Sequence, residues 1–271
     1  MVSFKEVEMD RVSFFDKNKI TELVKKQGFV IVNCKGSTRE FEHKVLEMSD
    51  LLSLGEVNNS QYNKHYFSEK ISKDYGLNII GTQKEYKSSI YHKAFESKEG
   101  QDLHVDGTFS EIGYVRLMML YCKNPAIKGG ETNLFNVLGA INDIKDSGIS
   151  IEPLFQKNAL RRVSKYEGVI AEHTDCIIKF DQSLGRYIVR FADDITCEWD
   201  ECCKNVNGLS LLLNELRERA YNKGAFKLTF KLEKDEMLIV DNVSLAHGRN
   251  AFIESSDSPR IMVRGTFRNG L

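Results

Sequence analysis

Three residues that can bind a metal ion constrain this chain more than any other feature of its sequence. His104 and Asp106 are separated by one residue, and His247 follows far downstream. In an extended strand, or in the loop that leaves it, residues i and i+2 point to the same side, so His104 and Asp106 can reach one ion. Two imidazoles and one carboxylate form the facial triad that holds non-haem Fe(II) and leaves other coordination positions open. The pattern therefore predicts a fold that brings the two distant segments together.

The His-x-Asp pattern alone is a weak signal, because a lone histidine is more often packed or exposed than bound to a metal. Three further segments strengthen it, and they follow in order: residues 128–133 (Lys-Gly-Gly-Glu-Thr-Asn), 240–249 (Val-Asp-Asn-Val-Ser-Leu-Ala-His-Gly-Arg) and 259–266 (Pro-Arg-Ile-Met-Val-Arg-Gly-Thr). Each has an ordinary explanation by itself, namely a hairpin turn, a histidine at a strand end and a pair of exposed arginines. However, Arg260 and Arg264 share one face of an apolar strand, and burying them there is costly unless anions meet them.

Charge and composition exclude several classes of function. The 38 basic and 39 acidic residues nearly cancel and form no long basic block, so a nucleic-acid surface has no electrostatic support. The N-terminus has no apolar signal region, and no apolar stretch approaches the roughly 20 residues that span a bilayer. The six cysteines are scattered without a Cys-x-x-Cys pair, which favours reduced thiols. We expect a cytoplasmic protein whose partner is a small molecule and not a nucleic acid or a membrane.

The periodicity of apolar residues predicts a mostly β, α+β chain. Helices are expected over residues 17–27, 38–54, 137–144 and 207–221. Strands are expected over residues 29–33, 114–122, 131–135, 168–173, 176–180, 187–191, 226–232, 237–241 and 260–267. Two helices followed by many short strands suggest a jelly-roll barrel (a double-stranded β-helix) with flanking helices, in one domain spanning residues 1–271. The polar, weakly periodic residues 58–100 are a candidate lid or substrate wall.

Taken together, these motifs resemble the TauD/TfdA-like (taurine dioxygenase) branch of the Fe(II)/2-oxoglutarate-dependent oxygenases. The resemblance runs from about residue 103 to the C-terminus, and the N-terminal third is similar only in its first helix and strand. It implies an enzyme that uses Fe(II), 2-oxoglutarate and O2. It also implies that oxidative decarboxylation of 2-oxoglutarate is coupled to hydroxylation of an unactivated C–H bond in a small polar substrate.

The resemblance also assigns roles to individual residues. It implies that His104, Asp106 and His247 bind Fe(II), and that Thr132 and Arg260 hold the distal carboxylate of 2-oxoglutarate. The latter role suits their chemistry, because a guanidinium gives bidentate bonds to a carboxylate and a hydroxyl adds another donor.

Two further positions have both a functional and an ordinary interpretation. Arg264 matches a residue that binds the acidic group of the substrate in sulfonate-oxidising members, but it can equally form a structural ion pair with Asp or Glu. Phe109 matches an apolar residue that lines the site, but it can equally pack in the core. If Arg264 does bind substrate, an amino acid or another carboxylate or sulfonate is expected. Amino-acid hydroxylation, in the manner of oxygenases from bacterial natural-product pathways, is our first hypothesis.

Several alternatives stay open at this point. The longer loop between His247 and Arg260 argues against taurine itself, and the intact Asp106 argues against halogenation. A sulfonate dioxygenase or a desaturase of the same family also fits the motifs. The sequence leaves the oligomeric state open, so a homo-oligomer is possible. A non-catalytic binding protein on the same barrel should have lost part of the triad. A zinc hydrolase built on the three ligands would leave Thr132 and Arg260 without a purpose.

Overall fold

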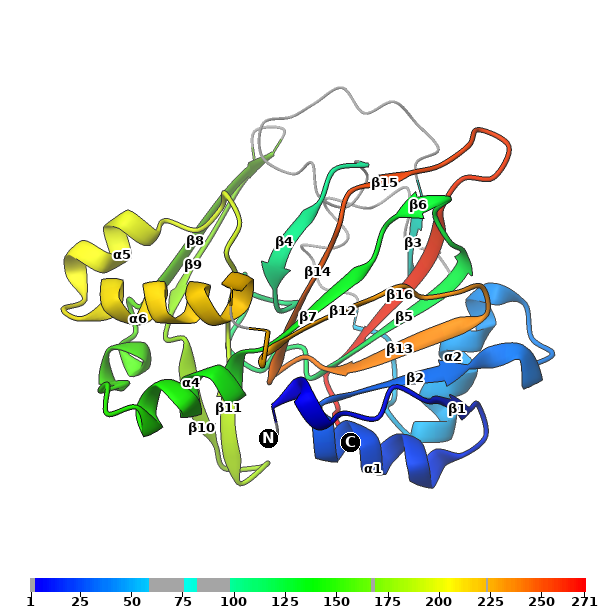
Figure 1. The fold of residues 1–271 in the computed structure, drawn as a ribbon, viewed down its shortest axis with the longest axis horizontal. Coiled ribbons are helices and arrows are strands. Elements are labelled where there is room, and N and C mark those ends of the chain that lie inside the picture. The colour runs from blue at the N-terminus through cyan, green and yellow to red at the C-terminus, as the bar shows by residue number, and fades with distance from the viewer. Residues whose placement is uncertain (1–2, 59–75, 82–97, 167–168, 223) are drawn as a thin grey trace.

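The computed structural model describes residues 3–58, 76–81, 98–166, 169–222 and 224–271. Most of the segment 58–100, the predicted lid or substrate wall, lies outside these residues, so that prediction stays a prediction. The described part contains both helices and sheets, as the periodicity of the apolar residues predicts (Figure 1). No helix in this part is long and apolar enough to cross a membrane.

The larger sheet has six strands within the described residues. Their order is β1 (Arg11–Ser13), β2 (Phe29–Asn33), β13 (Glu236–Asp241), β5 (Leu117–Asn124), β16 (Ile261–Phe267) and β3 (Asn78–Gly81). β1 and β2 are parallel, and the other neighbours are antiparallel. The helices α1 (Lys17–Gln27) and α2 (Phe41–Leu52) cover one face of this sheet (Figure 1).

The ends of α1 and α2 have local causes in the sequence. Asp16 caps α1 by accepting a hydrogen bond from the Lys19 backbone N–H at 3.0 Å, and Gly28 ends it with φ at +86°. Residues 17–27 and 29–33 therefore form the predicted helix and strand, and both predictions are confirmed. α2 is shorter than the predicted residues 38–54, because Glu40 is in extended conformation before it and Ser53 is left-handed after it.

A second sheet packs against the other face of the first. Among the described residues it has the order β12 (Lys227–Phe230), β7 (Thr132–Asn136), β14 (Leu245–Arg249) and β4 (Gln101–His104). Leu134 and Leu245 of this sheet share a buried cluster with Phe29 and Leu238 of the first. Alternate residues of β2 and β13 thus point to the two faces and separate the two clusters.

A third region of helices and hairpins flanks the second sheet (Figure 1). It comprises α4 (Val137–Asp146), α5 (Trp199–Asn205), α6 (Leu209–Arg217), the hairpin β8 (Leu160–Tyr166) and β9 (Val169–Asp175), and the hairpin β10 (Ile178–Asp181) and β11 (Arg186–Val189). All of these elements except β9 contribute residues to one apolar cluster. The remaining elements are the short pair β6 (Lys128–Gly129) and β15 (Phe252–Ile253), the 3-10 helices Phe4–Glu6, Cys34–Gly36 and Glu152–Phe155, and the π-helical turn Glu218–Asn222.

The segment that carries His247 differs from the sequence interpretation. The sequence predicts a strand over residues 237–241, which is confirmed as β13, and a histidine at a strand end as the ordinary interpretation of His247. The structure adds a further strand, β14, that begins at Leu245 after a turn, which the Ser244 N–H closes by donating to the Asp241 carbonyl at 3.1 Å. His247 therefore lies inside a strand of the second sheet, and the turn moves the chain from one sheet to the other.

Candidate metal and cosubstrate site

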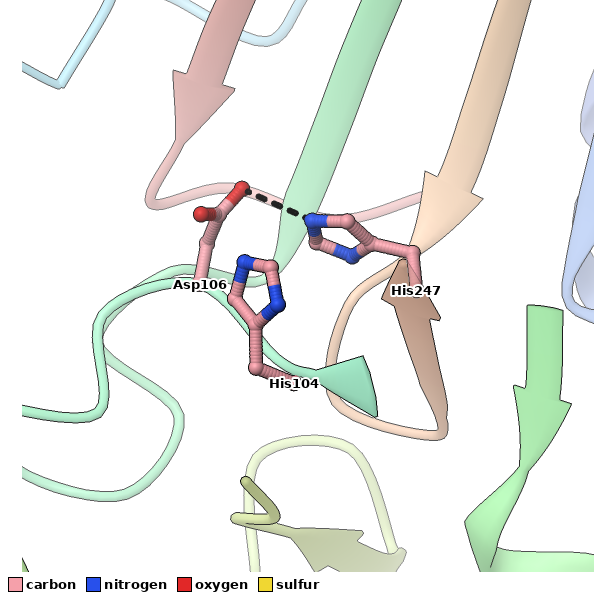
Figure 2. A group of neighbouring side chains, drawn as sticks. All are labelled: His104, Asp106 and His247. Carbon is pink, nitrogen blue, oxygen red and sulfur yellow. Dashed lines mark ion pairs between the residues drawn. The ribbon is translucent and has the colours of Figure 1, made fainter. Parts of the chain in front are cut away.

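His104, Asp106 and His247 lie together at one end of the second sheet (Figure 2). Each offers a ligand atom, and these atoms all lie within 4.8 Å of one another. His104 ends β4 and is the cross-strand partner of His247 on β14, with the two ring centroids 4.5 Å apart. Asp106 follows two residues after His104 in the loop that leaves the strand. The fold thus brings together the three residues that the sequence singles out, and their role as metal ligands stays a prediction.

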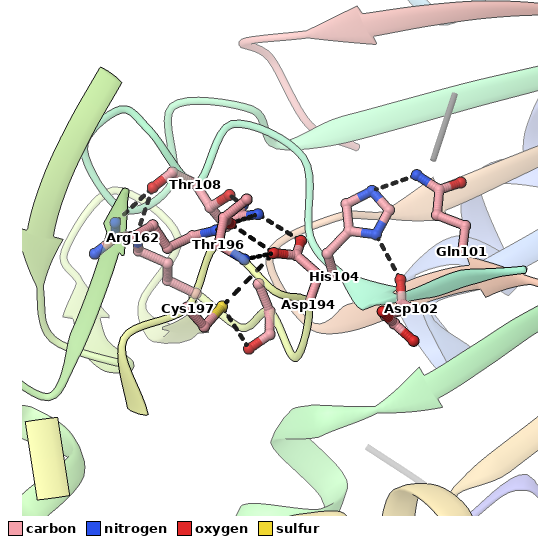
Figure 3. Close-up of polar contacts among 10 residues, drawn as sticks. Gln101, Asp102, His104, Thr108, Arg162, Asp194, Thr196 and Cys197 are labelled. Carbon is pink, nitrogen blue, oxygen red and sulfur yellow. Dashed lines mark hydrogen bonds and ion pairs between the residues drawn. The ribbon is translucent and has the colours of Figure 1, made fainter. Parts of the chain in front are cut away.

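The hydrogen bonds of His104 fix which nitrogen can bind a metal. Nδ1 of His104 lies 2.9 Å from the carbonyl oxygen of Asp102, which can only accept a hydrogen bond (Figure 3). Nδ1 therefore carries the proton, and Nε2 presents its lone pair. The side-chain nitrogen of Gln101 lies 3.3 Å from this Nε2. The imidazole is thus in the tautomer that a metal ligand requires.

His247 is uncharged at neutral pH. Burial, reinforced by nearby His104, lowers the pKa of His247 to about 3, although Asp106 opposes the shift. Its Nε2 lies 3.7 Å from Oδ2 of Asp106 (Figure 2). Because an imidazole binds a metal only in its neutral form, burial prepares His247 for that role.

Asp106 is ionised although it is buried. Burial acts to raise the pKa of Asp106, but the charge of Arg264, with Nη1 3.0 Å from Oδ1, lowers it below the usual range. Oδ2 is buried and has no hydrogen-bond partner among the described residues. A carboxylate with one unused oxygen beside two neutral imidazoles fits a divalent cation.

The backbone of Asp106 is held by Asn242, which follows β13 and is almost fully buried. The Asp106 N–H donates to Oδ1 of Asn242 at 2.8 Å, and Nδ2 of Asn242 donates back to the Asp106 carbonyl at 3.1 Å. The same amide nitrogen also donates to the Val115 carbonyl at 2.8 Å. Asn242 therefore fixes the loop that carries the carboxylate.

A pocket lies beside the triad. Ile80, Met118 and Leu120 form an apolar wall. The polar lining consists of Gln101, Thr132, His247, Arg249, Arg260 and Arg264.

Arg260 and Thr132, the predicted contacts of 2-oxoglutarate, both line this pocket. Arg260 is only 6% exposed, and its guanidinium carbon lies 5.2 Å from the centre of the Phe252 ring. Burial lowers the pKa of Arg260 to about 10, so it remains a cation at neutral pH. Thr132 is 5% exposed on the neighbouring sheet. A buried guanidinium that lines one pocket together with a hydroxyl fits an anion such as a carboxylate.

Phe109 is placed differently from the other predicted site residues. It is not among the described residues that line the pocket, and the guanidinium carbon of Arg162 lies 4.6 Å from the centre of its ring. Arg162 is buried and pairs with Asp194 at 2.5 Å, and it also donates to the Thr108 hydroxyl (Figure 3). The predicted role of Phe109 as a lining residue of the site stays a prediction.

Gln101, Asn242 and Arg249 lie at the site, but the sequence alone indicates no role for them. Asn242 and Arg249 lie inside the quoted segment 240–249, and Gln101 precedes His104 by three residues. The sequence therefore shows that these residues are near the predicted ligands along the chain. Their contacts depend on strand pairings that no local pattern specifies.

Comparison with known proteins relates this chain to dioxygenases. The family profile described as taurine catabolism dioxygenase TauD, TfdA family, matches residues 208–266. A uridine-5'-phosphate dioxygenase from Amycolatopsis sp. is 28% identical over 260 residues, which cover 94% of this chain and 91% of the relative. A second uridine-5'-phosphate dioxygenase, from Streptomyces sp., is 27% identical over 185 residues, or 68% of this chain and 67% of the relative.

Solved structures of oxygenases share the fold at low identity. Asparagine oxygenase in complex with Fe(II), 2S,3S-3-hydroxyasparagine and succinate superposes with a TM-score of 0.62 at 15% identity, over 94% of this chain and 79% of that one. PvcB from Pseudomonas aeruginosa gives 0.62 at 16% identity, over 94% and 82%. The profile match, the similarity along 94% of the chain and the shared fold all relate this chain to the TauD/TfdA-like Fe(II)/2-oxoglutarate-dependent oxygenases.

Proposed function

We propose that this enzyme oxidises a nucleoside 5'-monophosphate, with uridine 5'-monophosphate (UMP) as the first candidate. The observation that carries the proposal is the similarity to a uridine-5'-phosphate dioxygenase along 94% of the chain. The sequence interpretation favoured an amino acid, for which a shared fold with asparagine oxygenase gives a second candidate. Both candidate substrates are small and anionic or zwitterionic. They differ in the size and charge of the acidic group, which is a phosphate in UMP and a carboxylate in asparagine.

His104, Asp106 and His247 would hold the iron in this proposal. The support is their donor set, which combines a Nδ1-protonated His104, a neutral His247 and an Asp106 oxygen without a hydrogen-bond partner among the described residues. When bound there, Fe(II) supplies the activation of O2 that the oxidation needs. The chain itself holds the three ligand side chains together, next to the pocket that His247 lines.

Arg260 and Thr132 would hold the distal carboxylate of 2-oxoglutarate. Thr132 lies on β7 of the second sheet and Arg260 directly precedes β16 of the first, and both line the same pocket as His247, so a cosubstrate that reaches the metal could also reach them. The buried guanidinium of Arg260 supports this assignment, because a carboxylate would offset the cost of burying its charge. We also infer that the two facing sheets form the jelly-roll barrel expected from the sequence.

The charge of the pocket favours an anionic primary substrate. Three arginines line the pocket, namely Arg249, Arg260 and Arg264, and Asp106 lies against Arg264. 2-Oxoglutarate brings two carboxylates, and a phosphate monoester carries a charge of about −1.5 to −2 near neutral pH. A divalent cation and three guanidinium groups can therefore accept both anions.

The test is a comparison of substrates under identical conditions. The protein is incubated with Fe(II), 2-oxoglutarate and O2, together with UMP, asparagine or taurine, and succinate and the mass of each candidate substrate are measured. With the wild type we expect UMP to stimulate succinate formation and to be consumed in an amount equal to the succinate formed. The Asp106→Ala variant should form no additional succinate and consume no UMP. Stimulation by asparagine alone would favour the amino-acid alternative. Consumption of UMP without O2 or 2-oxoglutarate would instead indicate a hydrolase.

A further inference from the structure

We propose that Gln101 is a positioning residue of the metal site, whose side-chain amide holds His104 until a metal ion displaces it. Gln101 thereby competes with the metal for Nε2 of His104 and lowers the affinity of the site for a divalent cation. The inference rests on the proposed function, because it assumes that His104 is a metal ligand.

The first support is the contact between the two side chains. The side-chain nitrogen of Gln101 lies 3.3 Å from Nε2 of His104 (Figure 3). Because Nδ1 of His104 donates to the Asp102 carbonyl, Nε2 carries a lone pair and no proton, so Gln101 is the donor. One lone pair cannot accept this hydrogen bond and bind a metal ion at the same time. Gln101 must therefore leave Nε2 when a metal binds there.

The second support is a bulge in β4 that aims Gln101 at this nitrogen. His247 and Arg249 are two residues apart on β14, whereas their cross-strand partners His104 and Gln101 are three residues apart on β4. In a regular strand, side chains three residues apart point to opposite faces. The extra residue in β4 changes this alternation, as bulges beside functional sites commonly do. Gln101 and His104 can therefore meet on one face of the sheet.

The third support is the close approach of the two strands at Gly248, which faces the bulge. A Cβ atom at Gly248 would lie 2.6 Å from the carbonyl oxygen of Gln101 and 3.3 Å from that of Asp102. Only glycine leaves enough space for β4 at this distance from β14. The Asp102 carbonyl accepts the hydrogen bond from Nδ1 of His104. The close approach therefore positions both residues that bond to the imidazole, one at each ring nitrogen.

The pocket offers the displaced amide a polar environment. Gln101 is half-buried and lines the pocket together with Thr132 and Arg260. Water or a bound ligand in this pocket can accept from the amide once it has left His104. The competing explanations are that Gln101 orients His104 for the metal, or that it only fills space beside the ring. The three explanations predict different signs for the change in metal affinity when the amide is removed.

The test is calorimetric titration of the metal-free protein with Mn(II), without 2-oxoglutarate or UMP, so that contacts to those ligands cannot contribute. The wild type is compared with Gln101→Leu and with the matched control Gln182→Leu, in the exposed turn between β10 and β11. Gln101→Leu removes a hydrogen bond that is present only in the metal-free state. We expect it to bind Mn(II) about two- to tenfold more tightly, the value of one hydrogen bond between neutral groups, and the control to be unchanged.

Urea denaturation provides a second measurement that does not depend on the titration. Gln101→Leu should have a lower midpoint than the wild type without metal and an equal midpoint at saturating Mn(II), because the lost bond is absent from the metal-bound state. If Gln101→Leu does not fold, Gln101→Asn replaces it, since its shorter side chain keeps the amide but holds it farther from Nε2. The same tighter binding of Mn(II) is expected.

Two outcomes overturn the proposal. Weaker binding of Mn(II) by Gln101→Leu would show that Gln101 orients His104 for the metal, and unchanged binding would show that the amide only fills space. If the wild type itself binds no Mn(II), the assignment of His104 as a metal ligand fails, and with it the proposed function.

Discussion

Nη1 of Arg264 lies 3.0 Å from Oδ1 of Asp106, so the carboxylate at the centre of the triad is paired with a buried arginine. The sequence left two roles open for Arg264, a contact to the substrate or an ion pair with an acidic residue. The structure contains the ion pair, and the acidic partner is the predicted metal ligand itself. Because the pair uses only Oδ1, Oδ2 stays available toward His247.

The first prediction concerns stability without metal. Arg264→Gln removes the partner of a buried charge, which should lower the free energy of unfolding of the metal-free protein by about 3 kcal/mol. Adding Zn(II) or Mn(II) should recover much of this loss, because the metal supplies positive charge beside Asp106. Urea denaturation with and without metal measures both effects. An equal loss in the two conditions would show that the metal does not replace the arginine.

The second prediction concerns the use of the substrate. We expect the Arg264→Gln variant to consume more 2-oxoglutarate for each UMP oxidised than the wild type does. The reason is that an anionic substrate would lose the attraction of one cation in the pocket. Succinate and oxidised UMP are measured in the same samples, with Arg268→Gln as the matched control. A proportional decrease of both products would favour a purely structural role for Arg264.

The third prediction concerns the triad. His104→Ala and Asp106→Ala should lose Fe(II) binding while their far-ultraviolet circular dichroism remains that of the wild type, since each removes one of three ligands. His43→Ala, on α2 over the opposite face of the larger sheet, is the matched histidine control. Iron is measured after anaerobic loading and desalting. Retention of a full equivalent by either triad variant would contradict the assignment of ligands.

The fourth prediction concerns Arg260. Arg260→Gln should raise the apparent KM for 2-oxoglutarate by about 10- to 100-fold, because a charge-assisted hydrogen bond contributes about 1.5–3 kcal/mol. Initial rates of succinate formation at varied 2-oxoglutarate concentrations provide the measurement. A KM equal to that of the wild type would remove Arg260 from the cosubstrate site.

The fifth prediction concerns Asn242. Asn242→Ala leaves the buried N–H of Asp106 without its acceptor, which should cost about 1–3 kcal/mol of stability. We also expect weaker iron binding, because the loop that carries Asp106 is no longer held at both its N–H and its carbonyl. Val243→Ala, the adjacent buried residue, controls for a general loss of packing. If the two variants lose stability equally and bind iron equally well, Asn242 is only a packing residue.

The sequence predicts best where structure has a local cause. The cap at Asp16 and the left-handed Gly28 delimit α1, and the apolar run of residues 29–33 forms β2. The spacing of His104 and Asp106 likewise needs only strand geometry to place both on one side. These features depend on a few neighbouring residues, so a single sequence is sufficient to predict them.

Features that depend on pairing between distant segments could not be predicted from the sequence, because neighbouring residues do not determine them. The split between β13 and β14 follows from a turn that transfers the chain to the second sheet, and β4 is extended because it pairs with β14. The pairing of Arg264 with Asp106 and the clamp by Asn242 require three segments to meet, and no periodicity indicates those contacts. Phe109 could not be placed for the same reason, since its neighbour Arg162 comes from the distant hairpin of β8 and β9.

The most direct test of the account is an anaerobic titration of the metal-free protein with Fe(II) and 2-oxoglutarate, followed by visible absorption. We expect the weak charge-transfer band of 2-oxoglutarate chelated to Fe(II) to appear at one equivalent, to be lost in Asp106→Ala and to shift when UMP is added. The absence of the band in folded wild-type protein would contradict the iron and cosubstrate assignments together.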